Sequence, residues 1–392
     1  MISPEQDIIV VGGGLTGCLT ALYMSRRGLR VTLLEQGELL NGASLNNAGG
    51  LYFQLQPQFS AFGKEQRSKI RDLATLIKQA RPAWDRAIST IGDPSIANFC
   101  GGLIVSLDDE GNTALMEKHL QEKEWGFDTQ WLDSSHIKEI VPNISHKVKS
   151  ATYSAHEGYV DVVRCAQSLA HSIKDSDINL ATNVGKIKLA VNDKYYQART
   201  KQGYTYSSEQ IVLALGAYTG QTLLDLGIDL GIEAIPLQIF DFDYESPLLP
   251  VFIRRVGARL SMKQLPNGSV IVGGGWRALS NDLDKNIEII ENNITDCRSL
   301  AVEMFPALEN SLPLRARGGR AAWTQDGLPI VGEVASHPKL WLACGGNGYT
   351  LAPLYAELLT QKVLRQEPEY DLRPFSPERF LTNSFINIPP DG

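Results

Sequence analysis

The sequence predicts an α/β protein, α+β overall, in which a parallel sheet and an antiparallel sheet are interleaved along one chain. Three observations support this fold class. Residues 7–35 have the pattern strand, glycine turn, helix, strand; residues 340–364 have the pattern strand, glycine loop, helix; and residues 224–317 are rich in alternating β-type segments. Because 392 residues are many for one hydrophobic core, we expect two domains.

The first unit begins with Ile-Ile-Val-Val at residues 8–11, an apolar run typical of a strand that is buried on both faces of a parallel sheet. Gly12, Gly14 and Gly17 follow with the spacing GxGxxG. We expect Gly12 to make a tight turn, Gly14 to let the backbone approach a pyrophosphate, and Gly17 to let the helix pack closely on the strand. This pattern predicts a dinucleotide-binding turn.

A helix over residues 15–27 and a strand over residues 31–34 complete this unit. The free N–H groups at the helix start, at Leu15 and Thr16, and the positive end of the helix dipole favour a pyrophosphate there. Glu35 at the tip of the second strand is placed to accept hydrogen bonds from a ribose diol. Its charge disfavours a ligand of the NADP type, because a 2′-phosphate would be repelled.

The segment after Glu35 is rich in small and turn-forming residues, among them Ser44, Asn47, Gly49 and Gly50. Loops at the carboxyl edge of a doubly wound sheet bind ligands, so this segment is placed to cross the cofactor. An ordinary surface loop explains the same composition equally well.

The middle of the chain contributes further elements of both kinds. The turn at residues 215–220, which contains Gly216, either closes the sheet over the cofactor or simply ends a strand. The other predicted elements are a helix over residues 64–91, a strand over 99–107, a turn over 108–112, a helix over 113–125, a helix after Asp161 to about Ile173, and strands over 178–180 and 211–214.

The β-rich part of the chain contains a well-marked hairpin, in which residues 258–265 and 269–276 flank the turn Pro266-Asn267-Gly268. A helix is expected to follow over residues 283–304. An antiparallel sheet inserted between parts of an α/β domain indicates a second domain that is interleaved in sequence.

Near the C-terminus, a predicted strand over residues 340–343 leads into a glycine loop over 345–350. A helix over residues 351–364 follows, with Pro353 tolerated in its first turn. With this unit included, one domain is predicted to consist of residues 1–90, 150–223 and 318–392, and a second, substrate-binding and β-rich domain of residues 91–149 and 224–317.

Composition and charge exclude several classes of protein. With 37 Lys and Arg against 44 Asp and Glu, the formal net charge of -7 argues against a nucleic-acid partner. No apolar run approaches the ~18 residues that would span a bilayer, and no signal peptide precedes the first strand. Scattered cysteines without a CxxC pattern predict a reduced, cytoplasmic protein with no structural metal and no Fe–S ligand set: Cys18, Cys100, Cys165, Cys297 and Cys344.

Four motifs in order resemble the FAD-dependent amine and amino acid oxidoreductases related to D-amino acid oxidase, glycine oxidase and sarcosine oxidase. They are the glycine fingerprint with Glu35, the loop from Ser44 to Gly49, the sequence LALGAYTG, and TQDGLPIVG followed by GGNGY. The resemblance covers nearly the whole chain. It implies a Rossmann-like FAD-binding domain interleaved with an antiparallel-sheet substrate domain.

The same resemblance implies that the adenosine diphosphate of FAD binds at the first glycine turn and that the flavin lies near Gly49, Gly50 and the C-terminal glycine loop. A helix N-terminus at that loop stabilises the negative charge of a reduced flavin. The implied FAD-binding residues are Gly12, Gly14, Leu15, Thr16, Gly17, Glu35, Gln36, Ser44, Asn47, Ala48, Gly49, Gly50, Val184, Gly216, Gly346, Asn347, Gly348, Tyr349 and Thr350.

In this family, hydride passes from the substrate Cα–H to the flavin, and water hydrolyses the resulting imine. An amino acid substrate needs a guanidinium for its carboxylate. Arg320 is the nearest match to the family's position before the TxD motif, and Arg315 and Arg317 compete for the role. Trp276 is expected either to wall the pocket above the flavin or to pack in the core, and Tyr349 is the third residue expected at the substrate.

Two departures from relatives refine this expectation. Some relatives attach flavin through a cysteine just before TxD, but the stretch RARGGRAAWTQD has none, so FAD is expected to be dissociable. Sarcosine oxidases have an oxygen-activating lysine near the position of Trp276 and Arg277, and its absence here weakens the case for a true oxidase.

The leading hypothesis is an FAD-dependent enzyme that oxidises the Cα–N bond of an amino acid or secondary amine, of the glycine, sarcosine, D-amino acid, proline or opine type. A narrower version is the FAD-bearing subunit of an opine oxidase-like dehydrogenase, whose partner subunits accept the electrons. A non-catalytic flavin-binding scaffold is an alternative. An NAD-dependent dehydrogenase is disfavoured, since it would leave the C-terminal glycine unit without a role.

Overall fold

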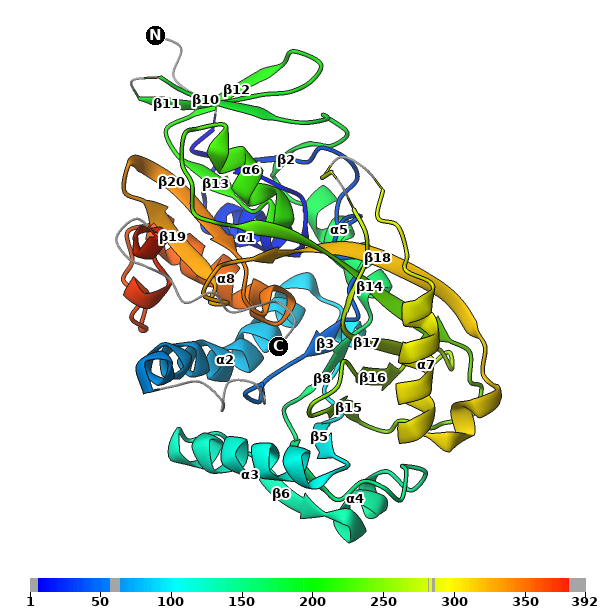
Figure 1. Ribbon diagram of the computed structural model, residues 1–392. Coiled ribbons are helices and arrows are strands. Elements are labelled where there is room, and N and C mark those ends of the chain that lie inside the picture. The colour runs from blue at the N-terminus through cyan, green and yellow to red at the C-terminus, as the bar shows by residue number, and fades with distance from the viewer. Residues whose placement is uncertain (1–5, 57–63, 193, 281, 284–285, 381–392) are drawn as a thin grey trace.

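Two large sheets, with two smaller ones, form the framework of the protein in the computed structural model, which describes residues 6–56, 64–192, 194–280, 282–283 and 286–380. Figure 1 shows the six-stranded sheet in the upper part of the molecule, the eight-stranded sheet below it, and β3 and β8 between them. The arrangement confirms the predicted fold class. The helices are α1 (Leu15–Arg26), α2 (Lys64–Ile91), α3 (Asp109–Glu124), α4 (Ser134–Ile140), α5 (Val162–Lys174), α6 (Thr219–Leu224), α7 (Asn292–Met304) and α8 (Gly348–Val363).

The six-stranded sheet is parallel except for one edge strand, and its central strand is the first in the chain. All four residues of β1 are buried, because alternate side chains reach different cores. Ile8 and Val10 face the core beneath α1, α2 and α8, whereas Ile9 and Val11 face a second core on the opposite side. The strand order is β19 (Ile330–Val334), β20 (His337–Cys344), β13 (Ile211–Leu213), β1 (Ile8–Val11), β2 (Val31–Leu34) and β9 (Asn179–Ala181).

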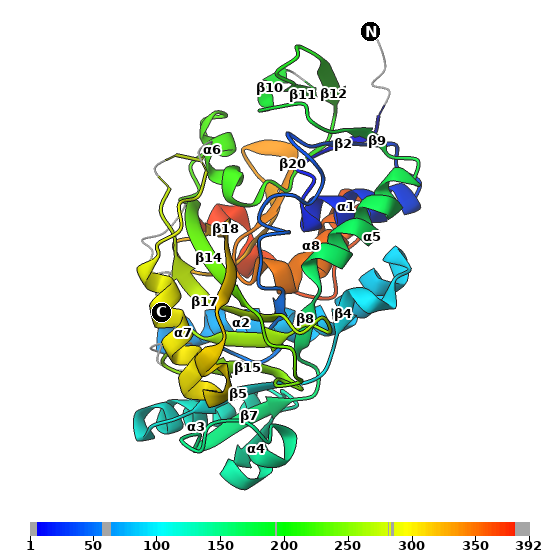
Figure 2. The same cartoon turned by 90° about the vertical axis from the view of Figure 1, so that its right-hand side faces the viewer.

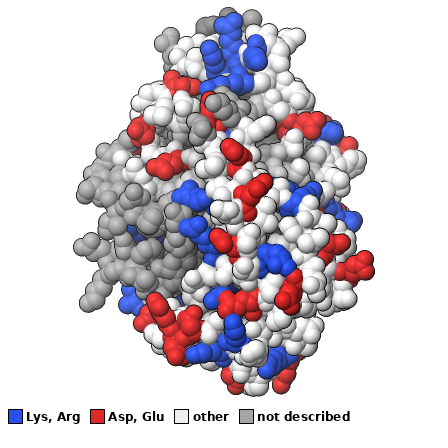
Figure 3. Space-filling view, turned by 45° about the vertical axis from the view of Figure 1, so that its right-hand side comes forward, with Lys and Arg blue, Asp and Glu red and all other residues white. Residues whose placement is uncertain are grey.

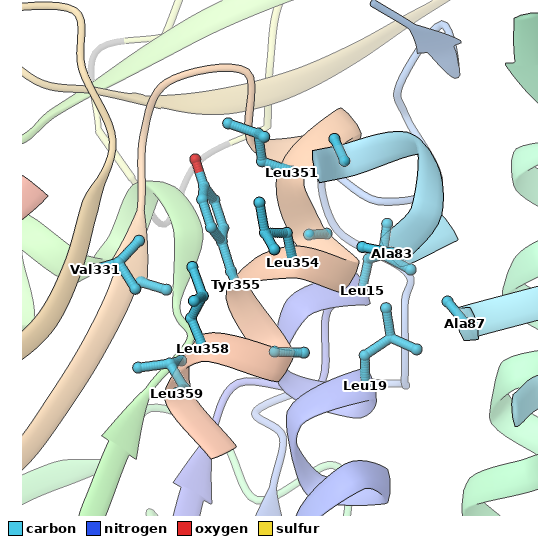
Figure 4. Close-up of a cluster of buried hydrophobic side chains, with 14 of the residues drawn as sticks. Leu15, Leu19, Ala83, Ala87, Val331, Leu351, Leu354, Tyr355, Leu358 and Leu359 are labelled. Atoms are coloured by element: carbon cyan, nitrogen blue, oxygen red, sulfur yellow. The ribbon is translucent and has the colours of Figure 1, made fainter. Parts of the chain in front are cut away.

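The core on the α1 side is formed by three helices that are far apart in sequence. Figure 4 shows Leu15 and Leu19 of α1 beside Ala83 of α2 and Leu354 of α8. The small alanines of α2 let that helix approach closely, and the leucines fill the remaining space. This packing joins the N-terminal and C-terminal strand, glycine turn and helix units into one body.

The eight-stranded sheet is antiparallel except for the pair β15 and β5. Helix α7 covers one face of this sheet, where Cys297, Ala301 and Met304 pack with the apolar strand residues. The strand order is β18 (Pro313–Trp323), β14 (Glu233–Phe242), β17 (Val270–Arg277), β16 (Ser261–Gln264), β15 (Phe252–Arg255), β5 (Gly102–Ser106), β7 (Ser150–Ser154) and β6 (Gln130–Asp133).

The sheet assignment corrects the domain division made from the sequence. Residues 150–154, placed with the first domain, form β7 of the eight-stranded sheet. The division at residue 318 cuts through β18, which pairs along its length with β14. Composition could not reveal these boundaries, because the sheet to which a strand belongs is decided by pairing with strands that are distant in sequence.

Two smaller sheets complete the molecule. The strands β10, β11 and β12 lie at the top in Figures 1 and 2, and Figure 3 shows Lys and Arg side chains gathered at this end of a face that otherwise mixes both signs of charge. Within the described residues, no helix is both long enough and apolar enough to cross a bilayer. The small sheets are β10 (Lys188–Asn192), β11 (Tyr195–Arg199) and β12 (Thr205–Ser208), and β3 (Gly50–Leu51), β8 (Gly158–Val160) and β4 (Ala97–Asn98).

Three helix starts differ from the sequence prediction. The predicted turn at residues 108–112 is the first turn of α3, because the Asp108 side chain caps the helix by accepting a hydrogen bond from the Gly111 N–H. Helix α7 begins at Asn292, later than predicted, and Leu279 pairs with Glu288 in a β-bridge before it. Helix α8 begins at Gly348, so Pro353 is its sixth residue and removes one backbone hydrogen bond inside the helix.

Candidate functional site

A cavity of 1640 Å³ lies between the two large sheets. This volume exceeds the ~300–1,000 Å³ of an ordinary ligand pocket, so it has room for a dinucleotide and a substrate together. Its wall is formed by the first glycine turn, the tip of β2, the loop over residues 40–50, the start of α8 and one face of the strands from β14 to β18. The predicted nucleotide end and the β-rich domain therefore share one cavity.

Packing explains the three glycines of the fingerprint. Gly12 has φ +108°, and a Cβ there would overlap the carbonyl oxygen of Ala214. A Cβ on Gly17 would overlap the carbonyl oxygen of Gly12, so this helix residue holds α1 against the turn without lining the cavity. At Gly14 a Cβ would meet Ser44 Oγ at 3.3 Å, and the backbone there faces the cavity.

Glu35 follows β2 and lines the cavity. Its Oε2 accepts a hydrogen bond from the Gly13 N–H (2.6 Å), and its Oε1 accepts one from the Gly37 N–H (2.8 Å). These bonds hold the carboxylate in place and leave acceptor sites for a ribose diol. Gly13, which was not among the predicted site residues, also has no room for a side chain, because a Cβ there would lie 2.7 Å from Leu39 Cδ2.

The loop over residues 40–50 lines the cavity, which favours the ligand-binding alternative over a plain surface loop. Ser44 Oγ accepts a hydrogen bond from the Leu15 N–H (2.9 Å), so the loop is tied to the start of α1. Asn47 Oδ1 accepts one from the Gly49 N–H (2.7 Å) and shapes a tight turn. Ala48 and Gly50 also face the cavity, whereas Gly49 does not.

The N-terminus of α8 opens into the same cavity. Gly345 and Gly346 both have positive φ and turn the chain after β20. The side chain of Asn347 makes no capping hydrogen bond, the first turn has no acidic residue, and Gly348 has open space around it. The helix therefore presents free N–H groups and the positive end of its dipole to an anionic group.

Several predicted residues lie elsewhere. Thr16, Gln36 and Gly216 line the cavity, but Val184 and Thr350 do not. The Val184 N–H donates a hydrogen bond to the Glu35 carbonyl (3.2 Å) and so helps to fix the backbone of Glu35. Thr350 is fully buried: its Oγ1 accepts from the Tyr52 N–H (3.2 Å), and its carbonyl accepts from Trp84 Nε1 (2.8 Å).

Of the three predicted arginines, Arg320 lines the cavity, and its Nη2 donates to Ser280 Oγ (2.7 Å) and to the Asp282 carbonyl (3.0 Å). Arg315 and Arg317 both bind the carboxylate of Asp241, at 2.5 Å and 2.9 Å. These two guanidinium groups are therefore committed to an ion pair on the sheet.

Of the two alternatives for Trp276, the structure favours packing in the core, and the side chain does not line the cavity. It shares one face of β17 with Val270 and Val272 and packs edge-on against Phe240 in the core beneath α7. Gly273 and Gly275, on the same strand, line the cavity instead.

Tyr349 lines the cavity, and its ring stacks on Trp84 with 6.2 Å between ring centroids. Burial raises the pKa of its phenol well above the usual value, and the nearby Cys165 and Asp161 act in the same direction. The phenol therefore stays protonated and cannot act as a base near neutral pH.

A buried charged network at the floor of the cavity was not predicted from the sequence. The Glu157 carboxylate, fully buried, accepts hydrogen bonds from the Phe53 and Gln54 N–H groups (both 3.0 Å) and from Arg254 Nη2 (2.6 Å). Arg254 lines the cavity. The available signal was an arginine directly after the apolar pair Phe252 and Ile253, in a strand that the prediction did not delimit.

A second missed residue is Lys263, buried on β16. Its Nζ donates to the Val160 carbonyl (2.6 Å) beside Gly49, and it lies 4.8 Å from the centroid of the Tyr159 ring. Burial lowers its pKa to about 7; Asp161 opposes this shift and Arg317 adds to it. The side chain faces Val160 and does not line the cavity.

These features define a class of protein: a dinucleotide-binding oxidoreductase whose cofactor site and substrate sheet meet in one cavity. The donor set suits FAD, since Glu35 can bind a ribose diol and two helix N-termini can face anionic groups. The sequence pattern of the FAD dependent oxidoreductase family, DAO, matches residues 7–362. The chain therefore belongs to this family of FAD-dependent oxidoreductases.

Individual relatives agree over nearly the full length. Glycine oxidase of Pseudomonas putida is 26% identical and aligns over 95% of this chain and 99% of its own. An opine oxidase subunit of Agrobacterium tumefaciens is 23% identical, over 96% and 98% of the two chains. The crystal structure of glycine oxidase from Geobacillus kaustophilus has the same fold, with a TM-score of 0.85, 22% identity, and coverage of 95% and 98%.

The overlap at Gly17 predicts that Gly17→Ala destabilises the apoprotein. Alanine is ordinarily favoured in a helix by about 1 kcal/mol, but the forced displacement of the Gly12 carbonyl reverses this preference. We expect a net loss of about 2 kcal/mol in the free energy of unfolding, measured by urea denaturation. In the control Gly42→Ala, where nothing lies within 4 Å, the change should stay within about 1 kcal/mol. Equal stability of G17A and the wild type would show that the close approach is unimportant.

The burial of Lys263 predicts a pH-dependent stability. Between about pH 7 and pH 10 the unfolded chain holds a proton on this lysine that the folded chain has lost, so its unfavourable contribution shrinks as the pH rises. The free energy of unfolding of the wild type, minus that of Lys263→Met, should increase by up to about 1.4 kcal/mol per pH unit over this range.

Urea denaturation at half-unit pH steps measures this difference. Exposed Lys188→Met is the matched control and should give a difference that does not depend on pH. Parallel stability curves for wild type and K263M would contradict the prediction.

Proposed function

We propose that this enzyme oxidises the Cα–N bond of an amino acid or N-substituted amino acid and passes the electrons to a partner subunit. One observation carries the proposal: a single cavity joins the nucleotide end at Gly12 and Glu35 to a sheet face that bears Arg254 and Arg320. Guanidinium groups in a cavity suit a substrate with a carboxylate. Bound FAD supplies the hydride acceptor for the substrate Cα–H.

The residues of this chain have distinct roles in the proposal. The N-terminus of α8 at Asn347 and Gly348 stabilises negative charge at the flavin end. Arg320 contacts the substrate at the β18 edge of the cavity. Tyr349, which stacks on the buried Trp84, forms an apolar part of the wall that restricts water. No side-chain nucleophile takes part. Water attacks the imine carbon after oxidation and releases the amine.

Two observations support a partner subunit as the electron acceptor. The opine oxidase relative is by its name one subunit of a larger enzyme. The segment where sarcosine oxidases have an oxygen-activating lysine holds Trp276 and Arg277 here, and Trp276 is in the core.

Anaerobic titration of the FAD-bound protein with amino acids, N-alkyl amino acids and opines tests this function. At least one member of the panel should bleach the flavin absorbance stoichiometrically, and the same substrate in air should yield little peroxide. Rapid peroxide formation by the isolated chain would refute the partner-subunit acceptor. A bound flavin that no amine reduces would instead favour a non-catalytic scaffold.

FAD should be released when the protein is precipitated with acid. Of the five cysteines, all described, Cys344 lines the cavity, and burial raises its pKa to about 12. Because the thiolate is the nucleophile, a thiol of this kind is a poor site for a covalent bond to flavin. The yellow colour should appear in the supernatant, measured by its visible absorbance. Colour retained in the washed pellet would demonstrate a covalent link.

A further inference from the structure

We infer that Arg254, together with Ser261 and Tyr52, binds the carboxylate of the substrate beside the flavin end of the cavity. This inference rests on the proposed function and names the anchor that selects an amino acid over a simple amine. It differs from the expectation based on sequence, in which Arg320 has that role.

Arg254 is a buried guanidinium with unused donors. Its exposed fraction is 8%, and of its five N–H donors the described structure engages one, on Nη2, with Glu157 Oε1 (2.6 Å). Its Nε is buried and has no hydrogen-bond partner among the described residues. A buried donor without an acceptor costs free energy, and the Arg254 side chain lines the cavity, so its remaining N–H donors can meet a ligand oxygen there.

Glu157 holds this guanidinium without using up its capacity. The carboxylate is fully buried and already accepts hydrogen bonds from the backbone N–H groups of Phe53 and Gln54 and from Gln54 Nε2 (3.0 Å each). It neutralises the positive charge of Arg254 and fixes the plane of the group. Pre-organisation of this kind lets a ligand carboxylate bind without ordering a flexible side chain.

Ser261 lies directly opposite Arg254 in the antiparallel pair of β15 and β16, so the two side chains are neighbours on one face. Its exposed fraction is 4%, and the residue lines the cavity. On the next strand Gly273 faces Ser261 in register, and the missing side chain leaves space over the hydroxyl. Guanidinium and hydroxyl therefore form one polar spot at the floor of the cavity.

The end of the loop over residues 40–50 and the residues that follow it lie against the polar spot formed by Arg254 and Ser261. A Cβ on Gly50 would meet Tyr52 Cζ and Oη at 2.9 Å, and a Cβ on Gly273 would meet Ala48 Cβ at 3.1 Å. The guanidinium of Arg254 lies 4.7 Å from the centroid of the Tyr52 ring. Ala48, Gly50 and Tyr52 thus place the anion spot next to the segment assigned to the flavin.

Arg320 lies on the other side of the cavity floor. Its strand β18 is separated from β15 by β14, β17 and β16, which is about 19 Å of sheet at ~4.8 Å per strand. The backbones that carry the two arginines therefore lie at well-separated positions of the cavity floor. Arg320 thus serves the remainder of the substrate, and the carboxylate beside Tyr52 belongs to Arg254.

Binding of propionate and propionamide to the FAD-bound protein tests the inference, because these probes differ in charge and need no turnover. Binding is measured by titration of the flavin absorbance and by the shift in melting temperature. In Arg254→Lys the charge balance with Glu157 is kept but the planar donor fork is lost. We expect propionate affinity to fall at least ten-fold and propionamide affinity to change by less than about two-fold.

Two control variants make the result specific. Arg320→Lys should bind propionate within about two-fold of the wild type. Arg379→Lys alters a similarly buried arginine that pairs with Asp326 at 2.8 Å outside the cavity, and it reports the general effect of such a change. If R254K does not retain FAD, Ser261→Ala and Tyr52→Phe decide the question, and each should weaken propionate binding several-fold.

The inference is overturned if R254K binds propionate as the wild type does, if R320K loses as much affinity as R254K, or if the wild type shows no saturable propionate binding. Unchanged propionate affinity in both S261A and Y52F also overturns it when R254K cannot be prepared. Failure of the proposed function has a different signature, because then no amino acid bleaches the flavin although propionate still binds through Arg254.

Discussion

The buried carboxylate of Glu157 connects the two halves of the molecule. It accepts hydrogen bonds from the backbone N–H groups of Phe53 and Gln54, which follow the loop over residues 40–50. It also accepts one from the guanidinium of Arg254 on the eight-stranded sheet. A buried charge is tolerated only when it is paired and hydrogen-bonded. Because Glu157 must keep these hydrogen bonds, it fixes the segment after the loop over residues 40–50 relative to the eight-stranded sheet. The shape of the cavity depends on this link.

A second ion pair extends the same network away from the cavity. Lys118 binds Glu122 at 2.7 Å with both side chains fully buried, and Lys118 also reaches Gln54 Oε1 at 3.0 Å. Burial lowers the pKa of Lys118 to about 8, against the opposing influence of Glu122. Helix α3 is thereby joined to the segment that carries Tyr52, and two positive and two negative groups balance inside the protein. Such a network specifies geometry more than it adds stability.

Local sequence patterns predicted most of the fold but not its details. The run at residues 8–11 and the glycines after it are set by contacts a few residues apart, so the first unit and the fold class were predicted correctly. The predicted start of α7 was wrong because Leu279 and Glu288 pair in an isolated β-bridge before the helix, and hydrophobic periodicity cannot show such a pairing. The side of the sheet on which Trp276 lies could not be predicted, because one face of β17 lines the cavity and the other faces α7.

By itself, the sequence determined the nucleotide-binding turn and the class of enzyme, because the steric demands at Gly12, Gly14 and Gly17 and the acid at Glu35 act within a single strand, turn and helix unit. The tertiary structure alone decided which cation meets the substrate. Arg254 is distant in sequence from Tyr52 and Glu157, and it becomes an anion site only when two sheets bring these groups together. Contacts between segments that are distant in sequence set the position of this charge, and the spacing of neighbouring residues in the sequence cannot predict such contacts.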